Sequence, residues 1–462
     1  MRLVVVPPLF DLTLTPVIEA DDRLIDLNAH FVHRLTAPDA LRQLAERVPA
    51  DEAVFVHAAA AALGRERAGF GTLRAAGLAL RFAAANDPSL RLAGDDVELV
   101  DGSTESSTQV VAAAARTRLF DPEIALAATA GQVIHLVLET DQQLPAVVGI
   151  VAAVGAGNVV LCGRFATEHR AALGAVEALR GVRFDEWAPR WRLADDWAPR
   201  PIRWVKRPGD WTPGEEWVGW LAPRDVLAVP AEAWASCVGL TVTAAQVHGD
   251  DFVDVHGDTV DLSGFTPSIE LLVGAPGVSA EETRETAIRL VESGRLAGLS
   301  PFRLPAGAPP VWAGTALDLL DVSGHDLPRW SRFAVAEAPL AELNAELASR
   351  ADYPGRFAAE ATPLAELNAE LASRTDLYPG RFAACCLSRP DEPGDWDPSA
   401  VVVDSSVVNL RTGRAFRVHP KLAPVLERLA NGDAHALTRL PEAGRVKLAD
   451  QLVRSGALRR SA

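Results

Sequence analysis

The stretch EIALAATAGQVIHLVL, residues 123–138, decides the fold class together with NVVLCG, residues 158–163. The first stretch begins like a strand, turns at residues 129–131 and continues as a helix, and a second helix is expected over residues 142–154. NVVLCG is a short apolar run, as is LVVVPPLF at residues 3–10, and both are typical of buried parallel strands. Strands that alternate with helices and end in glycine predict an α/β protein with a doubly wound parallel sheet.

The residues between the first strands are expected to be helical. Apolar residues recur at helical spacing over residues 26–48, where Thr36 and Pro38 indicate the end of one helix and the first turn of the next. Ligands of doubly wound sheets bind outside the carboxyl ends of the strands. These ends are predicted at Pro7, at residues 129–132 and at residues 163–165.

Charge is distributed unevenly along the chain. The 462 residues carry a formal net charge of -16, which argues against nonspecific binding of nucleic acid by the whole protein. Residues 411–462 nevertheless hold eleven Arg and Lys against four Asp and Glu, a local balance of +7 that leaves -23 on the rest. The sequence therefore predicts a basic module attached to an acidic body.

Cysteine usage and hydropathy indicate a cytoplasmic protein. The four cysteines form neither a disulfide framework nor a zinc pattern. The most apolar run, residues 146–162, is interrupted by glycines, and the opening residues lack the features of a signal peptide. We therefore expect no membrane partner.

Several of these features together resemble a known family. They are Pro7 and Pro8 after the first strand, the Asp-Leu-Asn start of a helix at residues 26–28, the turn at residues 129–132, and VVLCGRF at residues 159–165. In this order they resemble the cobalamin-binding domain of cobalamin-dependent radical SAM proteins, especially those that modify ribosomally made peptides. The resemblance implies that cobalamin, if retained, would contact Pro7, Thr129, Gly131, Gln132, Gly163 and Arg164.

Active members of this family carry a Cys-x3-Cys-x2-Cys loop that holds a 4Fe-4S cluster. The corresponding stretch here is WLAPRDVLAVPAEAWASCVGLTVTAA, residues 220–245, and counting from Cys237 places Thr241 and Ala244 at the other two ligand positions. Neither side chain can replace a thiolate. We therefore expect neither the cluster nor S-adenosylmethionine. The preferred expectation is that the chain binds no cofactor, and the alternative is that it binds cobalamin.

The rest of the barrel expected of this family is shortened. Residues 268–304 resemble the later part of a radical SAM barrel, with a Ser279-x-x-Glu282 capping box and a further strand from residue 302. Only about thirty residues separate Cys237 from Leu271, the length of a single βα unit. The resemblance therefore implies a truncated, partial TIM barrel.

Three other segments have ordinary structural interpretations. Residues 187–234 hold eight of the eleven tryptophans and are expected to be an interdomain linker, the alternative being an aromatic platform for a peptide or a nucleobase. QVHGDDFVDVHGD, residues 246–258, alternates like a hairpin, so no metal site is expected at His248, Asp254 and His256. PLAELNAELASR at residues 339–350 recurs at residues 363–374 and reads as a duplicated helix-loop insertion, or alternatively as a substrate-like tail.

The C-terminal segment predicts a winged-helix-like module. Strands are expected over residues 400–408 and 415–418, around a turn at residues 411–413, and three helical stretches follow. This order resembles the peptide-recognition domains of ribosomal-peptide biosynthesis, in which a leader peptide adds a strand to the hairpin edge and packs on a helix. The residues expected to bind the peptide are Val407, Asn409, Arg411, Arg414, Phe416, Arg445, Leu448 and Arg454.

These interpretations combine into one expectation for the whole chain. The segments are a cobalamin-binding-like Rossmann domain (1–185), a Trp-rich linker (186–235), a truncated radical SAM-like domain (236–335), the duplicated insertion (336–398) and the winged-helix-like domain (399–462). We expect a pseudoenzyme without catalytic or metal-binding residues that binds a precursor peptide and presents it to an active maturation enzyme, in a hetero-oligomer. The alternatives are a cobalamin-binding methyltransferase component and a winged-helix DNA-binding regulator.

Overall fold

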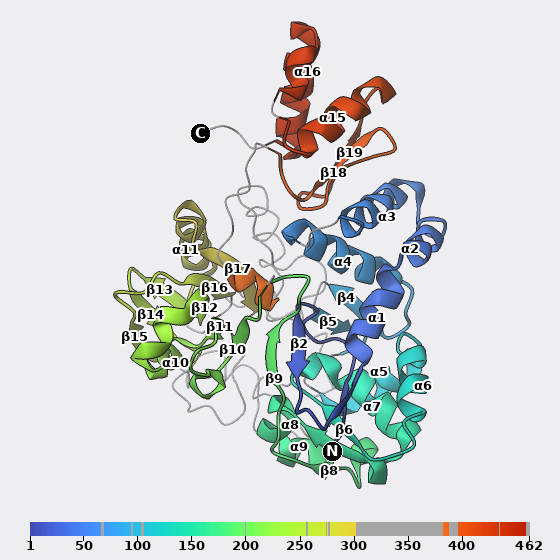
Figure 1. Ribbon diagram of the computed structural model, residues 1–462, viewed down its shortest axis with the longest axis vertical. Helices are drawn as coiled ribbons and strands as arrows, with labels where there is room; N and C mark the ends of the chain where they lie inside the picture. Colours follow the sequence, from blue (N-terminus) through green and yellow to red (C-terminus); the bar gives the residue numbers. More distant parts are fainter. Residues whose placement is uncertain are drawn as a thin grey trace.

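The computed structural model describes residues 1–65, 69–93, 96–102, 106–198, 200–255, 257–273, 275, 278–301, 382–387, 396–433 and 435–458. Within them the protein is mixed α/β, with two sheets made largely of parallel strands (Figure 1). This confirms the predicted α/β class. The duplicated insertion at residues 339–384 lies almost wholly outside the described residues, as do His256 and residues 302–304.

The first sheet has five parallel strands in the order β3-β1-β6-β7-β8. Numbered along the chain this order is 2-1-3-4-5, which is a common order of doubly wound sheets. Its strands are β1 (Leu3–Val6), β3 (Arg23–Asp26), β6 (Ile134–Val137), β7 (Val159–Cys162) and β8 (Arg183–Phe184).

The helices of this unit share one apolar core with one face of the first sheet. Leu3, Val5, Leu136 and Leu161 contribute to it from alternate positions of the strands. The helices that join this core are α1 (Leu27–Thr36), α4 (Phe70–Ala83), α5 (Ser107–Arg116), α6 (Asp121–Ala128), α7 (Leu144–Val154), α8 (Arg164–Glu168) and α9 (Arg170–Ala175).

Residues 37–100 are inserted between β3 and the helices that precede β6. They form α2 (Pro38–Ala45) and α3 (Ala50–Leu63), followed by α4 and a hairpin of β4 (Leu90–Ala93) and β5 (Asp96–Leu99). Pro38 stands in the first turn of α2, as the sequence predicts. α3 packs against both α2 and α4, so the insertion is a helical layer.

The second sheet has seven strands in the order β17-β16-β12-β11-β10-β9-β2. The strands from β10 to β17 are parallel to one another, whereas β9 and β2 run antiparallel at one edge. Its strands are β2 (Leu14–Val17), β9 (Arg190–Leu193), β10 (Arg203–Val205), β11 (Trp217–Leu221), β12 (Cys237–Ala244), β16 (Ser268–Val273) and β17 (Leu296–Pro301).

Two predicted boundaries are wrong in this sheet. The Trp-rich segment is not a linker, because it supplies β9, β10 and β11. Residues 1–185 are also not a closed unit, because β2 leaves the first sheet and pairs with β9. The physical reason is burial: Trp191, Trp204 and Trp217 are each less than a tenth exposed, and large aromatic side chains suit a sheet that is covered on both faces.

The remaining connections of the second sheet are short. A capping box of Ser279 and Glu282 opens α11, as predicted, and residues 246–261 form an antiparallel sheet that contains the predicted hairpin. The next parallel strand begins at Leu296, and residues 302–304, where the sequence predicts a strand, lie outside the described residues. The elements are α10 (Pro223–Ala228), β13 (Gln246–His248), β14 (Asp251–Val253), β15 (Thr259–Asp261) and α11 (Ala280–Glu292), with short 3-10 turns at η4 (Pro208–Asp210) and η5 (Ala231–Ser236).

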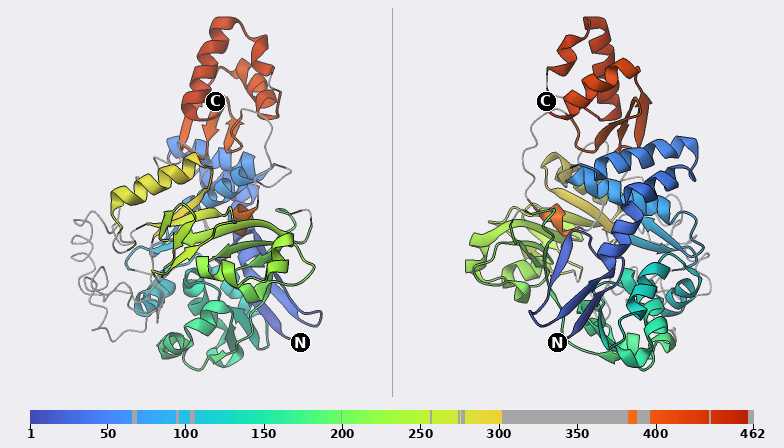
Figure 2. Two further views of the ribbon diagram at one scale, coloured as in Figure 1. Left: turned by 90° about the vertical axis from the view of Figure 1, so that its left-hand side faces the viewer. Right: turned by 45° about the vertical axis from the view of Figure 1, so that its right-hand side comes forward.

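The two large sheets pack directly on each other. Val4, Val6 and Cys162 of the first sheet share a core with Trp204 and Trp220 of the second. In the described part of the chain, the second sheet therefore occupies the face on which a doubly wound fold would carry its other layer of helices. Figure 2 shows the two sheets side by side, with the helices that cover the first sheet on its other side.

The C-terminal residues form a module of one small sheet and two helices. The sheet has the antiparallel order β18-β19-β20, so the predicted strand over residues 400–408 is in fact two strands. The module comprises β18 (Ala400–Val403), β19 (Ser406–Asn409), β20 (Arg414–Arg417), η8 (Pro420–Leu422), α15 (Ala423–Ala430), η9 (Ala436–Arg439) and α16 (Glu442–Ser455).

This small sheet lies between two helical layers. Val401 and Val408 pack on Ala58 and Ala62 of α3, whereas Val407 packs on the other face with α15 and α16. Figure 1 shows the module above α3 and α4, which places residues far apart in the sequence side by side. No helix among the described residues has the length and apolar character needed to cross a lipid bilayer.

The segment Phe382–Leu387 returns to the second sheet and is held there by backbone contacts. The Ala383 N–H donates to Asp11 Oδ2 (2.6 Å), and the Ala384 N–H donates to Thr13 Oγ1 (3.1 Å). A Cβ on Gly239 of β12 would lie 1.8 Å from the Cys386 carbonyl oxygen. Close backbone approach therefore requires glycine at this position.

Replacement of Gly239 by alanine is expected to displace this segment and to lower the free energy of unfolding by about 1–3 kcal/mol, because neither backbone can yield freely. Chemical denaturation measures the change. Gly209→Ala is the matched control, since no atom lies within 4 Å of its added Cβ. Equal stability of the two variants would contradict this packing.

Asp11, which holds the segment Phe382–Leu387, makes the stability of the fold depend on pH. Burial raises the pKa of Asp11 from 3.8 to about 6, opposed by hydrogen bonds from Thr13 and Ala383. Because the folded state then holds a proton that the unfolded state has already lost, stability falls as pH rises from about 4 to about 6. We expect wild type to show this fall relative to Asp11→Asn in denaturation at several pH values. Parallel pH profiles would contradict it.

Candidate functional site

The three positions aligned with cluster ligands all lie in one strand. Cys237, Thr241 and Ala244 belong to β12. The loop expected at these positions is therefore a β-strand. Ala244 joins the core beneath α11, whereas Gly239 and Thr241 belong to the face that the segment Phe382–Leu387 covers. Positions on opposite faces of a strand cannot converge on one cluster.

The cobalamin-contact residues predicted from the sequence divide between two ends of the first sheet. Pro7, Gly163 and Arg164 follow β1 and β7 at the carboxyl edge. Thr129, Gly131 and Gln132 precede β6 and therefore lie at the opposite edge, because residues 121–128 are helix and not strand. The start of α6 has a sequence signal, an Asp with proline and glutamate in the first turn, that marks a helix N-terminus.

The carboxyl edge itself is filled by the chain's own side chains. Gln143 Nε2 donates to the Pro7 carbonyl (3.2 Å), and its Oε1 accepts from the Glu139 N–H (2.8 Å). A Cβ on Gly163 (φ +97°) would lie 2.7 Å from the Leu138 carbonyl oxygen. Glycine is therefore needed here because the backbone of Leu138 lies close by. The position gives no sign of space kept for a corrin ring.

A small charged cleft remains beside this edge. Arg164 lies 3.9 Å from Glu139 and 3.5 Å from Asp210, and burial raises the pKa of Glu139 while Arg164 opposes that rise. The cleft has a volume of about 250 Å³, below the range for drug-sized ligands. A corrin is larger still, so the residues at this edge do not fit cobalamin.

Two buried carboxylates in and beside the second sheet accept hydrogen bonds from other side chains of the protein. Asp254 accepts from Arg224 Nε (2.7 Å), and Glu270 accepts from Trp220 Nε1 (2.9 Å) and Thr243 Oγ1 (2.7 Å). Each carboxylate therefore ties neighbouring elements together. His248 is exposed, and the described residues contain no cluster of three or more potential metal ligands.

The predicted peptide-binding residues of the C-terminal module fall into two groups. Val407 and Leu448 are core residues, and Asn409 is fully buried, so these three cannot contact a peptide on the folded module. Arg411 is bound to Asp397 in an ion pair whose two side chains are at most 8% exposed. The residues that remain accessible or half-buried are Arg414, Phe416, Arg445 and Arg454.

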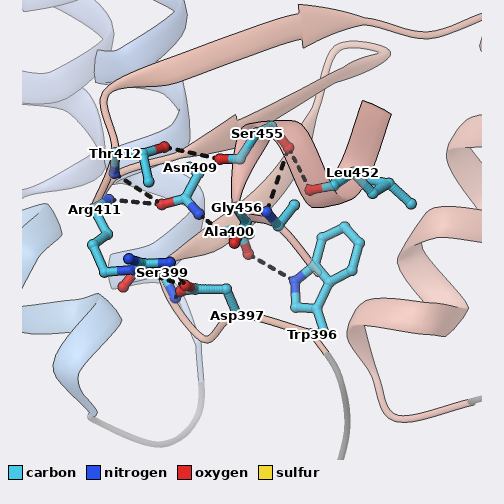
Figure 3. A network of polar contacts seen from close by, with 11 residues as sticks. Trp396, Asp397, Ser399, Ala400, Asn409, Arg411, Thr412, Leu452, Ser455 and Gly456 are labelled. Atoms are coloured by element: carbon cyan, nitrogen blue, oxygen red, sulfur yellow. Dashed lines mark hydrogen bonds and ion pairs between the residues drawn. The ribbon is translucent and has the colours of Figure 1, made fainter. Parts of the chain in front are cut away.

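The buried group forms the frame that holds the module together. Figure 3 shows Arg411 Nε donating to Asp397 Oδ2 (2.8 Å) and Asn409 Nδ2 donating to the Gly456 carbonyl (2.8 Å). Thr412 Oγ1 donates to the Ser455 carbonyl (2.9 Å). These contacts join the turn before β20 to the end of α16, and so fix the helix beside the strand.

β20 is an edge strand among the strands that the structure describes. The Val418 N–H donates to the Ser405 carbonyl, and hydrogen-bonded pairs alternate along antiparallel strands. Arg414 and Phe416 therefore direct their backbone groups toward β19. The N–H and C=O groups of Ala415 and Arg417 point away from the sheet, and no further described strand pairs with them.

The predicted single strand over residues 400–408 is divided by a turn, and this turn sets the register of β20. Asp404 and Ser405 have φ values of +46° and +59°, as a two-residue hairpin turn requires, and they divide the predicted strand. The dipeptide between two valine runs, VVVDSSVVN, is the signal that could have shown it. With the hairpin in place, β20 becomes the edge and Ala415 and Arg417 become its outward positions.

A groove of about 430 Å³ runs beside this edge. Ala415, Phe416 and Arg417 line it from β20, and Asp404 and Ser406 line it from the adjoining turn and strand. The opposite wall belongs to the first turns of α3, with Ala50, Asp51, Ala53, Val54 and His57. The site thus combines an open strand edge with a groove between two separate segments of the chain.

Comparisons with family models, with curated proteins and with solved structures give no match to this chain. The family resemblance drawn from the sequence therefore stays a prediction.

Arg411→Ala is expected to destabilise the module by about 3–5 kcal/mol, because Asp397 would remain buried without its charged partner. Hydrogen exchange of the β18–β20 amides reports this loss directly. Arg454→Ala, which removes an exposed ion pair with Asp450, is the control and should leave exchange almost unchanged. Equal exchange in the two variants would show that the frame does not depend on the buried pair.

Proposed function

We propose that this chain is a non-catalytic, radical SAM-like protein that binds a precursor peptide in extended conformation and presents it to a partner maturation enzyme. One observation carries the peptide-binding part: the backbone groups of Ala415 and Arg417 face outward from an edge strand. An extended peptide can satisfy those groups by adding a strand to the sheet. The resemblance of the N-terminal and C-terminal segments of the sequence to proteins of ribosomal-peptide maturation supports the choice of a precursor peptide.

The charge near the edge favours an acidic peptide. Arg414 and Arg417 are exposed on β20, and Arg414 Nη1 donates to the carbonyl of Arg454 at the end of α16 (2.6 Å). Carboxylates on a bound strand would lie close to the guanidinium group of Arg414, and such groups bind carboxylates strongly. Such attraction would weaken with added salt, because the groups are exposed.

The non-catalytic part of the proposal rests on two arguments. Thr241 and Ala244 lack thiolates, and their places on β12 do not converge with Cys237. The cobalamin-contact residues inferred from the resemblance do not assemble at one edge, so the methyltransferase alternative loses its support. We propose no cofactor for this chain.

DNA binding is a second candidate because the same module is basic. Lys447 is exposed on α16 and Arg445 is half-buried there, and either could contact phosphate. The two functions differ in what they require of the backbone. Phosphate contacts need cationic side chains only, whereas strand addition needs the outward N–H groups of β20.

Ala415→Pro separates these functions, because proline removes an outward N–H while leaving the β19–β20 hydrogen bonds intact. We expect it to weaken binding of an acidic leader-like peptide by about tenfold or more, measured by fluorescence anisotropy. Ala415→Thr retains the N–H and should bind like wild type.

Duplex DNA is the second probe for the same variants. Wild type should bind the peptide and not the duplex. Peptide binding that survives Ala415→Pro would contradict strand addition. Salt-sensitive duplex binding that Arg417→Glu weakens and Ala415→Pro does not would favour the DNA-binding candidate.

A further inference from the structure

The groove beside β20 has a second wall that comes from the distant helix α3. Ala58 and Ala62 of α3 pack on Val401 and Val408 of the small sheet. The helix therefore crosses one face of the sheet, and its first turns extend to the open edge, where Ala50 and Val54 line the groove. A strand added to β20 would lie directly beside these turns.

Strand alternation decides which side chains of such a peptide enter the groove. Ala415 and Arg417 belong to the face that packs on α3, whereas Arg414 and Phe416 belong to the face toward α15 and α16. Alternate side chains of an added strand therefore face the α3 wall. The others share the face of Arg414.

The two faces differ in chemistry. On the α3 side the wall is made of small apolar side chains, Ala50, Ala53 and Val54. The groove also holds the imidazole of His57, the guanidinium group of Arg417 and two carboxylates, those of Asp51 and Asp404. Because the two carboxylates outnumber the single guanidinium group, a further carboxylate from the peptide gains little there, whereas an apolar side chain would be buried against the alanines. On the other face, Arg414 offers a cation close to the end of α16.

We infer that α3 and β20 together form one composite peptide site, which selects an extended segment in which apolar side chains alternate with carboxylates. The apolar side chains enter the groove and the carboxylates lie on the opposite face, beside Arg414. This inference rests on the proposed peptide-binding function and adds a specificity to it. It also makes the N-terminal insertion part of the binding site.

The test uses the full chain and two fluorescein-labelled peptides of equal composition. In one peptide valine alternates with glutamate, and in the other the valines and glutamates form separate blocks. Wild type is expected to bind the alternating peptide about tenfold more tightly, because only that pattern satisfies both faces. Equal binding of the two peptides overturns the inference and leaves the proposed function standing.

Substitutions in α3 test the second wall. Ala50→Trp fills the groove and should weaken binding of the alternating peptide about tenfold, with a smaller loss for Ala50→Leu. Ala61→Trp is the matched control, because Ala61 is exposed on the same helix and does not line the groove. Circular dichroism confirms that each variant is folded.

The pattern of losses separates the two claims. If Ala415→Pro weakens binding and Ala50→Trp does not, α3 is no part of the site and the inference fails alone. If neither peptide binds wild type, the inference and the proposed function fail together. If light scattering shows a dimer that Ala50→Trp and Ala415→Pro both dissociate, the edge is occupied by a second copy and the inference is overturned.

Discussion

The packing of the first sheet against the second, largely parallel sheet is the constraint on which the rest of this structure depends. A parallel sheet needs apolar cover on both faces. Helices cover one face of the first sheet, and the tryptophan-rich strands of the second sheet cover the other. β2 reinforces the arrangement because it leaves the first unit to pair with β9. The space where a doubly wound domain would bind a large ligand is consequently reduced to a small charged cleft.

The small C-terminal sheet is arranged in a different way. Both of its faces are covered, by α3 and by the helices α15 and α16, but no strand in the described part of the chain pairs with the outer side of β20. Natural proteins commonly protect such edges with charge, and Arg414 and Arg417 serve that purpose here. The same charges and the same open backbone groups would attract an acidic extended peptide. Protection from aggregation and recognition of a peptide are thus compatible uses of one strand.

The sequence predicted those features that depend on local patterns. Short apolar runs predicted β1 and β7, Pro38 marked the start of α2, and the capping box of Ser279 marked the start of α11. Each of these signals acts within a few residues of its consequence. The α/β class followed from them.

What the sequence could not give depends on contacts between distant segments. β2 pairs with β9, and α3 packs on the C-terminal sheet. The pattern of apolar residues within one segment does not indicate which distant segment it contacts. The position of Ala50 in the groove could not be predicted for the same reason, because an exposed alanine on a helix has no side-chain chemistry that indicates a binding site. The misreading of residues 123–138 had another origin, because a short apolar run suits a strand and a buried helix equally well.

Hydrogen exchange at β20 in the presence of the alternating valine-glutamate peptide tests the central claim most directly. Strand addition predicts that the amides of Ala415 and Arg417 become protected when the peptide binds. The amides of Arg414 and Phe416 should change little, because they already donate to β19. Peptide binding without new protection at Ala415 and Arg417 would contradict the account.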